Sequence, residues 1–342
     1  MAFKLNHIVG LLGLSFMLHG FSAFAEQPSV EEVFTVLGMD KIQVAELLQG
    51  QPVTYALSEK SEDELGVAVI QYLPLPLAKV LEHLRIDDIG LLEVNVTAHG
   101  LLTTNSKVDS LKTISLSNED ALTLLNAEPG DDFNLSAQEI DSFKSFKKTL
   151  KYNPHTSISG AVGQHYREIL FQRFQAYRQG GTYAMAPYMR EDDLESKVSV
   201  ELHQAAKASF ILERYFPDFF KVWLDYPKIL PTGAKETFPW VEKNVEGRLT
   251  TILRHRIDID WSGGALILIR EFYASHSYNS SQWITGCFAY REGTVVFQQV
   301  RSYTDQVAGV ASDVKHLVGR ELLKDKMLKY FERLCFVLDH CR

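Results

Sequence analysis

The chain has 342 residues, of which 46% are hydrophobic and 23% are charged, and these fractions are typical of a globular protein rather than a disordered one. Its formal net charge of −8 argues against nucleic acid as a partner, because nucleic-acid binding requires a basic surface. Three cysteines are too few for a disulfide scaffold. Cys335 and Cys341 are close enough in sequence to pair and leave Cys287 free, although three unpaired thiols remain the alternative.

The first 25 residues have the three parts of a cleavable secretory signal peptide. Lys4 provides a positive charge, an apolar run covers residues 8–21, and Ala23 and Ala25 place small side chains at the cleavage positions. The run is shorter than the roughly 20 apolar residues that span a bilayer, and no later stretch is long and apolar enough. We therefore predict an exported protein without a transmembrane segment after cleavage, periplasmic in a Gram-negative bacterium and otherwise secreted; an uncleaved anchor is the alternative.

The N-terminal part of the mature chain predicts a hairpin followed by a helix. Residues 26–50 have a helical lead-in, and two strands are expected at 52–58 and 65–73 on either side of a charged turn. Pro76 is well placed in the first turn of a helix, and Leu77, Val80, Leu81 and Leu84 form its apolar stripe. One or two further strands are expected within residues 91–102.

The middle of the chain, from about residue 115 to 226, has the period of helices. Ser117 and Ser136 each begin a capping-box pattern, which marks the start of a helix. A long helix is expected near residues 165–179, and Gly180-Gly181 is expected to end it. The region predicts about five helices.

The C-terminal third predicts an antiparallel meander and one long helix. Strands are expected at 238–246, 249–259, 265–278, 283–290 and 294–303, with glycine-containing turns at Gly247, 262–264 and 291–293. The helix is expected over residues 312–338. Its predicted apolar stripe consists of Val314, Leu317, Val318, Leu322, Leu328, Phe331, Cys335 and Leu338.

The order of elements in residues 52–84 and 239–338 resembles the helix-grip fold of the START-like, polyketide-cyclase-like superfamily. The opening strand Gly66-Val67-Ala68-Val69-Ile70-Gln71-Tyr72, the proline and helix after it, and the final strands and helix carry the resemblance. It implies an α+β fold in which a curved antiparallel sheet grips a long C-terminal helix, with a cavity for an apolar ligand between them. The helical middle departs from that pattern, and the family has no universal catalytic set of residues.

These expectations divide the chain into four parts. Residues 1–25 form the signal peptide, and residues 26–114 form the N-terminal part of the helix-grip domain. Residues 115–233 are a helical insertion, and residues 234–342 form the C-terminal sheet and helix.

The densest polar cluster of the sequence lies along and after the strand at 265–278. Histidine and tyrosine side chains can hydrogen-bond a polar ligand group or exchange protons, whereas a lone histidine on an apolar strand face is more often a satisfied core residue. On an unbroken strand Arg270, Phe272, His276 and Tyr278 share one face. The ligand-binding candidates are His255, Arg270, Phe272, His276, Tyr278 and Asn279.

Sequence motifs for hydrolysis, zinc or calcium are absent, so neither a metal nor a cofactor is expected. The terminal helix carries lysines and arginines that suit peripheral contact with an anionic membrane, but interspersed acids favour a solvated face.

Three hypotheses follow for function. The leading one is a non-catalytic exported protein that binds a lipid-like or other apolar small molecule between sheet and helix. The second is a cavity enzyme of the cyclase or hydrolase type using His255, His276 or Tyr278, which requires two of these side chains at one open space. The third is an interaction module acting through the helical insertion. The fold also predicts direct contact between strand 265–278 and helix 312–338, so that Leu322→Asp would prevent folding.

Overall fold

The structure is a computed structural model that describes residues 28–85, 89–130, 132–150 and 157–338. The predicted signal peptide over residues 1–25 and the predicted disulfide partner Cys341 lie outside the described residues.

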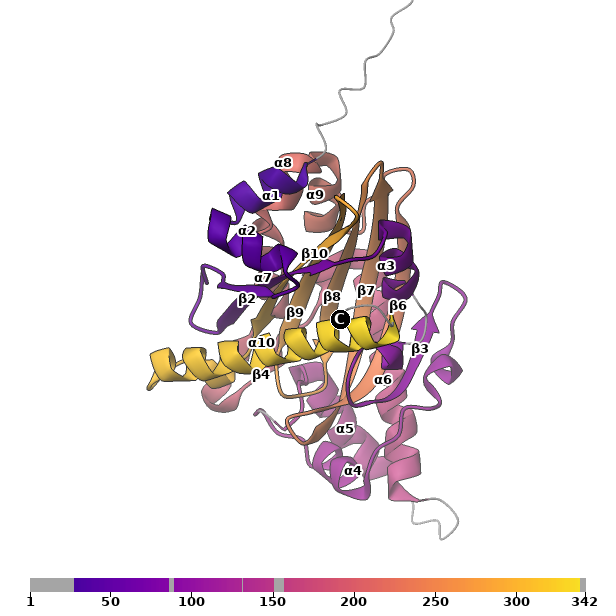
Figure 1. Cartoon of the computed structure of the whole chain (residues 1–342). Coiled ribbons are helices and arrows are strands. Elements are labelled where there is room, and N and C mark those ends of the chain that lie inside the picture. Colours follow the sequence, from indigo (N-terminus) through magenta and orange to yellow (C-terminus); the bar gives the residue numbers. More distant parts are fainter. Residues whose placement is uncertain (1–27, 86–88, 131, 151–156, 339–342) are drawn as a thin grey trace, which may run out of the picture.

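An eight-stranded antiparallel sheet forms the centre of the molecule (Figure 1), in the order β1-β2-β10-β9-β8-β7-β6-β3. Valine, isoleucine, phenylalanine and tyrosine are frequent in its long strands, where such side chains pack well on a pleated surface. The strands are β1 (Val53–Ala56), β2 (Glu64–Leu73), β3 (Val96–Leu102), β6 (Lys235–Val245), β7 (Arg248–Trp261), β8 (Gly264–Ala274), β9 (Ser280–Tyr290) and β10 (Gly293–Tyr303).

Two helices cover one face of this sheet, α3 (Leu77–Leu84) and the long C-terminal α10 (Ser312–Val337), which runs across the strands (Figure 1). Alternate residues of the strands, among them Val67, Val69 and Ile267, point to this side and share a buried apolar cluster with Phe331 of α10. We call this side the α10 face. A curved antiparallel sheet crossed by a long terminal helix confirms the predicted α+β, helix-grip type of architecture.

The remaining helices cover the opposite face. Two apolar clusters lie there: one joins Leu266 and Leu268 of β8 to the N-terminal helices, and the other joins Phe272 to the long helix α6. The sheet is therefore the middle of three layers. The helices are α1 (Val30–Val36), α2 (Lys41–Leu48), α4 (Asn118–Leu125), α5 (Ala137–Thr149), α6 (Ile158–Gly180), α7 (Val198–Lys207), α8 (Phe210–Tyr215) and α9 (Pro217–Leu224).

The ends of these helices follow local sequence signals. Ser136 forms the predicted capping box with Glu139 at the start of α5, and Ser117 caps α4 by accepting a hydrogen bond from the Asp120 N–H. Helix α6 ends at the predicted glycines because Gly181 has φ = 62°, and a Cβ atom there would lie 1.8 Å from the Tyr226 carbonyl oxygen. Short elements complete the chain: the ribbon β4 (Tyr188–Met189) and β5 (Glu195–Ser196), and the 3₁₀ turns η1 (Ile89–Leu91), η2 (Val108–Leu111), η3 (Gly181–Ala184), η4 (Glu191–Asp193) and η5 (Asp305–Val307).

The predicted apolar stripe of the terminal helix is wrong in its N-terminal half. Val314, Leu317, Val318 and Leu322 are 62%, 59%, 54% and 48% exposed, whereas Phe331 is buried as predicted. Leu323, Met327 and Leu334 are buried in place of the exposed residues. The predicted contact partner also differs: α10 packs chiefly on β2, and a cavity separates much of it from β8. The position of β2, a strand distant in sequence, determines which side of α10 is buried.

Candidate functional site

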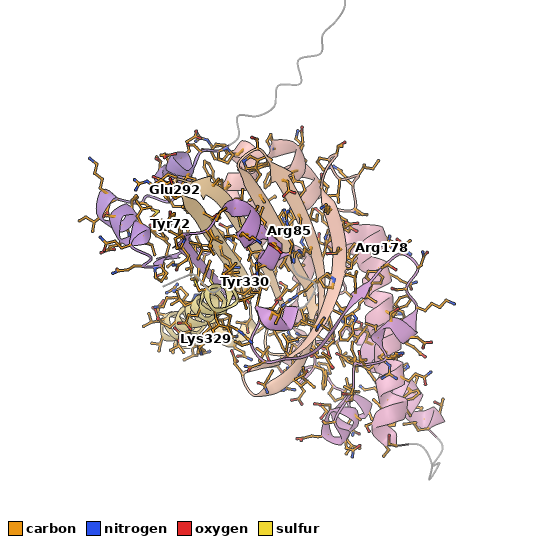
Figure 2. All side chains as sticks on the ribbon, turned by 45° about the vertical axis from the view of Figure 1, so that its right-hand side comes forward. Tyr72, Arg85, Arg178, Glu292, Lys329 and Tyr330 are labelled. Atoms are coloured by element: carbon orange, nitrogen blue, oxygen red, sulfur yellow. The ribbon has the colours of Figure 1, made fainter. Side chains whose placement is uncertain are left out.

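A cavity of about 480 Å³ lies between the α10 face of the sheet and α10 itself. Leu84 of α3 and Leu92 of the following segment form one wall, and Leu323 and Tyr330 of α10 form another. In Figure 2, Tyr330 and Lys329 project from α10, and Arg85 marks the end of α3 on the same side of the sheet. This volume lies within the range of small-molecule sites, roughly 300–1,000 Å³.

Strand register fixes the order of side chains on the cavity floor. In one row across neighbouring strands Glu271 lies between Arg254 and Ser281, and this row is polar. In the next row Ile269 of β8 lies beside Trp283 of β9. A third row again carries polar groups, because Thr285 of β9 pairs with Gln298 of β10. All of these side chains line the cavity. Arg256 beside Ile269 and Ile267 beside Thr285 line it as well, so polar and apolar side chains are mixed within these two rows.

The polar row is held by ion pairs. Arg254 lies 2.5 Å from a Glu93 oxygen through Nη1 and 2.7 Å from Glu271 Oε1 through Nη2. Lys243 Nζ is 2.9 Å from Glu93 Oε2, and the Tyr278 hydroxyl donates to Glu271 Oε2 at 2.7 Å. Burial alone would raise the pKa of Glu93, but Arg254 and Lys243 overcome that effect and hold it well below its usual range. The charges of this row therefore neutralise one another.

Three uncharged polar atoms of the floor have no hydrogen-bond partner among the described residues. They are Ser281 Oγ, Trp283 Nε1 and Gln298 Oε1, and all three are buried. The amide nitrogen of Gln298 donates to Thr285 Oγ1 at 3.2 Å, which leaves its carbonyl oxygen as the unmatched end. Buried polar atoms are usually paired. These three atoms have almost no surface open to the cavity, so a bound molecule would reach them only after their side chains turned toward it.

The rim of the cavity carries charges of both signs on α10 and on the β6–β7 turn. Lys326 and Lys329 of α10 are exposed, and so are Asp325 and Glu246. Lys326 Nζ is 4.0 Å from Glu246 Oε1, and partial burial lowers the pKa of Lys326. The rim therefore has no excess of positive charge among the described residues.

Of the six residues predicted from sequence, Tyr278 alone lines this cavity. A bulge at Phe272 breaks the alternation assumed for β8, because Leu253 pairs with Tyr273 and Arg254 pairs with Glu271. Phe272 and Tyr273 consequently both face the opposite side of the sheet. The predicted grouping of Phe272 with Tyr278 on one face is wrong because of this bulge and because β8 ends at Ala274, before Tyr278.

His255 and Arg270 also lie on the opposite face, under α6 and α9. His255 is fully buried between the Tyr177 hydroxyl, 2.8 Å from Nδ1, and Glu236, 2.9 Å from Nε2. Burial lowers the pKa of His255 to about 4. Arg270 donates to the Trp223 carbonyl and the Tyr177 hydroxyl, and its guanidinium lies 4.0 Å from the centre of the Trp223 ring. This cluster joins two layers of the protein.

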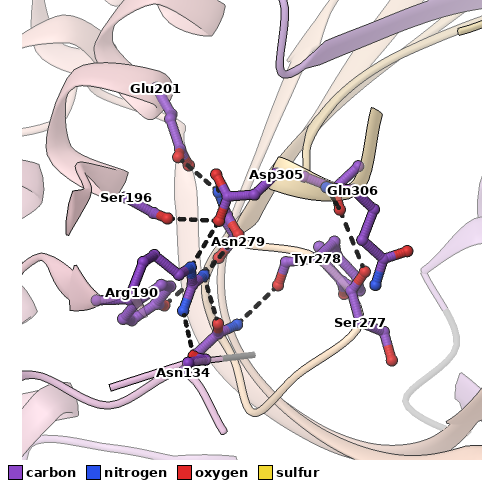
Figure 3. A network of polar contacts seen from close by, with 12 residues as sticks. Asn134, Arg190, Ser196, Glu201, Ser277, Tyr278, Asn279, Asp305 and Gln306 are labelled. Atoms are coloured by element: carbon purple, nitrogen blue, oxygen red, sulfur yellow. Dashed lines mark hydrogen bonds and ion pairs between the residues drawn. The ribbon is translucent and has the colours of Figure 1, made fainter. Parts of the chain in front are cut away.

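His276 and Asn279 belong to the loop between β8 and β9. His276 Nε2 lies 2.9 Å from the Leu249 carbonyl oxygen, and burial lowers its pKa to about 4. The carbonyl side of Asn279 accepts from Arg190 Nη2, and its amide donates to Glu201 and Asp305 (Figure 3). Asn279 therefore helps to tie the helical segment to the start of the C-terminal helix.

The geometry separates the three residues of the enzyme hypothesis. His255 and His276 are 0% and 2% exposed on different parts of the fold, and Tyr278 lines the cavity. The cavity therefore does not bring any two of these three side chains together, as an enzyme would require.

The residues of the cavity that were not predicted from the sequence include Glu93, Arg254, Trp283 and Gln298. The alternation of polar residues along β9 was a signal for part of this set, but the contribution of Glu93 depends on a long-range contact.

Within the described ranges, no three His, Cys, Asp or Glu side chains are grouped so that they could hold a metal ion. No helix there is long and apolar enough to cross a membrane. Cys287 is a buried free thiol whose pKa burial raises to about 12, whereas Cys335 is disulfide-bonded. Because Cys341 lies outside the described residues, its pairing with Cys335 stays a prediction.

Comparisons with known proteins give little further information. No family model matches the sequence, and no curated protein matches it. Among solved structures, the crystal structure of Ara h 8.0201 is similar over 30% of this chain, with 16% identity and a TM-score of 0.22. The chain spans 65% of the length of that protein. A similarity this weak supports no argument, so the fold assignment rests on the strand order and the position of α10.

Proposed function

We propose that this protein binds an amphipathic small molecule, without catalysis, in the cavity between the sheet and α10. The observation that carries the proposal is the cavity itself, about 480 Å³ in volume, with apolar walls and a floor that mixes apolar and polar side chains. Ligand sites typically combine apolar walls with a few convergent polar groups. The separation of His255, His276 and Tyr278 favours binding over the cyclase or hydrolase alternative.

Membership of the START-like superfamily and export to the envelope are part of the same proposal. The order of elements supports the first, and the three-part N-terminal sequence supports the second. Expression of the full chain in a Gram-negative host tests export: N-terminal sequencing of the periplasmic protein is expected to begin at Glu26. Retention of Met1 in a membrane fraction would contradict cleavage.

Binding is tested with the purified protein by native mass spectrometry and by titration with Nile red, an uncharged dye that fluoresces in apolar surroundings. Saturable binding of one dye molecule is expected. The variant Ile269→Trp places a large ring in the middle of the cavity floor and is expected to lower dye affinity at least about tenfold, or about 1.4 kcal/mol.

A matched variant controls for the added ring. Val318→Trp puts the same side chain on the outer side of α10, where Val318 is 54% exposed, and dye affinity is expected to stay unchanged. Wild-type protein that binds no dye and carries no co-purified lipid would overturn the proposal. Equal dye binding by Ile269→Trp and wild type would place the site elsewhere.

A further inference from the structure

The charges around the cavity are nearly balanced, and most of them are paired with one another, which restricts what the cavity can hold. Among the described residues, five basic and four acidic side chains line it. Arg254 and Lys243 share Glu93, and Arg254 also pairs with Glu271. The remaining floor base, Arg256, donates from Nε to Asp258 Oδ1 at 2.9 Å.

An ionised ligand group would therefore enter without a free partner on the floor. Moving an unpaired carboxylate or ammonium group out of water is costly unless a matching charge and hydrogen bonds receive it. At the rim, Lys326 and Lys329 are accompanied by Glu246 and Asp325, so a charged head group finds no excess of either sign there.

The unmatched polar atoms of the floor are uncharged, and they include both a hydrogen-bond donor and a hydrogen-bond acceptor. Trp283 Nε1 is a donor, Gln298 Oε1 is an acceptor, and Ser281 Oγ can be either. Trp283 pairs with Val300 in the register, two residues along β10 from Gln298. Diagonal neighbours of this kind are roughly 7–8 Å apart, a separation that one small molecule can bridge.

From this arrangement we infer that the ligand is an uncharged amphiphile. Its apolar body lies along Ile269 and Leu323, and its hydroxyl or carbonyl groups hydrogen-bond Trp283 and Gln298 once these two side chains turn toward the cavity. The inference rests on the proposed function of the cavity and specifies its ligand class. Charge discrimination, rather than chain length, then becomes the main selectivity of the site.

The test compares molecules that differ in one head group. Decan-1-ol, decanoate and decyltrimethylammonium are each used to displace Nile red from the wild-type protein at neutral pH. Decan-1-ol is expected to compete at concentrations at least about tenfold lower than either ion, equivalent to about 1.4 kcal/mol. Decanoate or decyltrimethylammonium competing as well as decan-1-ol would overturn the inference and leave the proposed function standing, whereas failure of the dye itself to bind would overturn both.

A charge variant is expected to reduce the preference for decan-1-ol over decanoate. Glu93→Gln removes the acid shared by Arg254 and Lys243, leaves one uncompensated positive charge on the floor, and is expected to raise decanoate affinity about tenfold relative to decan-1-ol. Glu332→Gln removes an exposed acid of α10 that does not line the cavity, and its ligand preference is expected to match wild type. Unchanged preference in a folded Glu93→Gln protein would contradict the charge argument.

A second variant tests the hydrogen-bonding part and does not depend on the folding of Glu93→Gln. Trp283→Phe keeps one aromatic ring and removes the N–H group together with the five-membered ring of the indole, so affinity for decan-1-ol is expected to fall at least about threefold to tenfold, the effect of the lost hydrogen bond alone. Equal decan-1-ol affinity in wild type and Trp283→Phe would overturn the role assigned to Trp283.

Discussion

Arg190 is the centre of the polar network that joins the helical segment to the sheet (Figure 3). Its Nε donates to Asp305 Oδ2 at 2.6 Å, and its Nη2 donates to the side-chain oxygens of Asn134 and Asn279 at 2.8 and 3.0 Å. Ser196 donates to the same Asp305 oxygen. Because Asp305 begins the turn η5 before α10, the network fixes where the terminal helix starts.

Glu201 makes this network sensitive to pH. It is 4% exposed and accepts hydrogen bonds from Ser280 Oγ at 2.6 Å and Asn279 Nδ2 at 3.0 Å. Burial raises its pKa to about 7 from the ordinary 4.5, and these hydrogen bonds offset only part of that effect. The folded protein therefore holds a proton on Glu201 at pH values where the unfolded chain has released it.

This raised pKa predicts that Glu201 contributes stability below about pH 4.5 that is lost as the pH rises through about 7. The loss is about 3 kcal/mol, from roughly 1.4 kcal/mol for each pKa unit. Urea unfolding at a series of pH values is expected to show a smaller decline for Glu201→Gln than for wild type. Burial also raises the pKa of Glu242 to about 7, so the free energy of unfolding is expected to keep some dependence on pH in both proteins.

The control for this measurement is Glu213→Gln, an exposed carboxyl of α8. Its unfolding free energies are expected to follow wild type at every pH. Parallel curves for Glu201→Gln and wild type would show that Glu201 does not hold the additional proton.

At the scale of elements, α10 has apolar side chains on both of its sides. Leu323, Met327 and Phe331 point to the sheet, and Gly319 lies directly on Leu65 of β2, where a Cβ atom would come within 2.7 Å of Leu65 Cδ1. Val314, Leu317 and Val318 lie on the outer side. Periodicity shows that the helix is amphipathic, but it does not distinguish two apolar sides when both recur at helical spacing.

Two substitutions in α10 are therefore expected to differ strongly. Phe331→Ala removes a side chain that is 2% exposed and is expected to lower the free energy of unfolding by about 3–5 kcal/mol. Leu322→Asp changes a residue that is 48% exposed and is expected to cost about 0.5 kcal/mol, opposite to the sequence-based expectation of a failure to fold. Thermal unfolding followed by circular dichroism compares them, and an unfolded Leu322→Asp protein would contradict the observed orientation of α10.

At the scale of the whole molecule, the sequence predicted what local signals determine. The strands of the C-terminal meander and the end of α6 at Gly181 follow from alternation and from glycine conformation. The bulge at Phe272 was missed because it changes which side residues face without changing the composition of the strand. Of the cavity, Tyr278 was predicted, whereas the pairing of Arg254 with Glu93 joins residues 161 positions apart.

The helical segment predicted as an insertion covers much of the sheet opposite α10. Trp240, Leu253 and Tyr273 are 1%, 0% and 0% exposed beneath it. Burial of each such side chain is worth roughly 1.5–3 kcal/mol, and a whole domain is stable by only about 5–15 kcal/mol. If the helical segment were removed, Arg270 would also lose its contacts with the Trp223 carbonyl and the Trp223 ring, which stabilise its buried charge.

Excision of residues 115–233, with a short flexible linker between residues 114 and 234, is therefore expected to leave a chain that does not fold. The exposed apolar face of the sheet would cause aggregation, because an uncovered patch of this kind is an association site. Near-ultraviolet circular dichroism and size-exclusion chromatography measure the result, with full-length protein as the reference. A monomeric remainder with native-like aromatic signals and cooperative unfolding would show that the helix-grip part folds alone, and that the helical segment is a true insertion rather than the third layer on which this sheet depends.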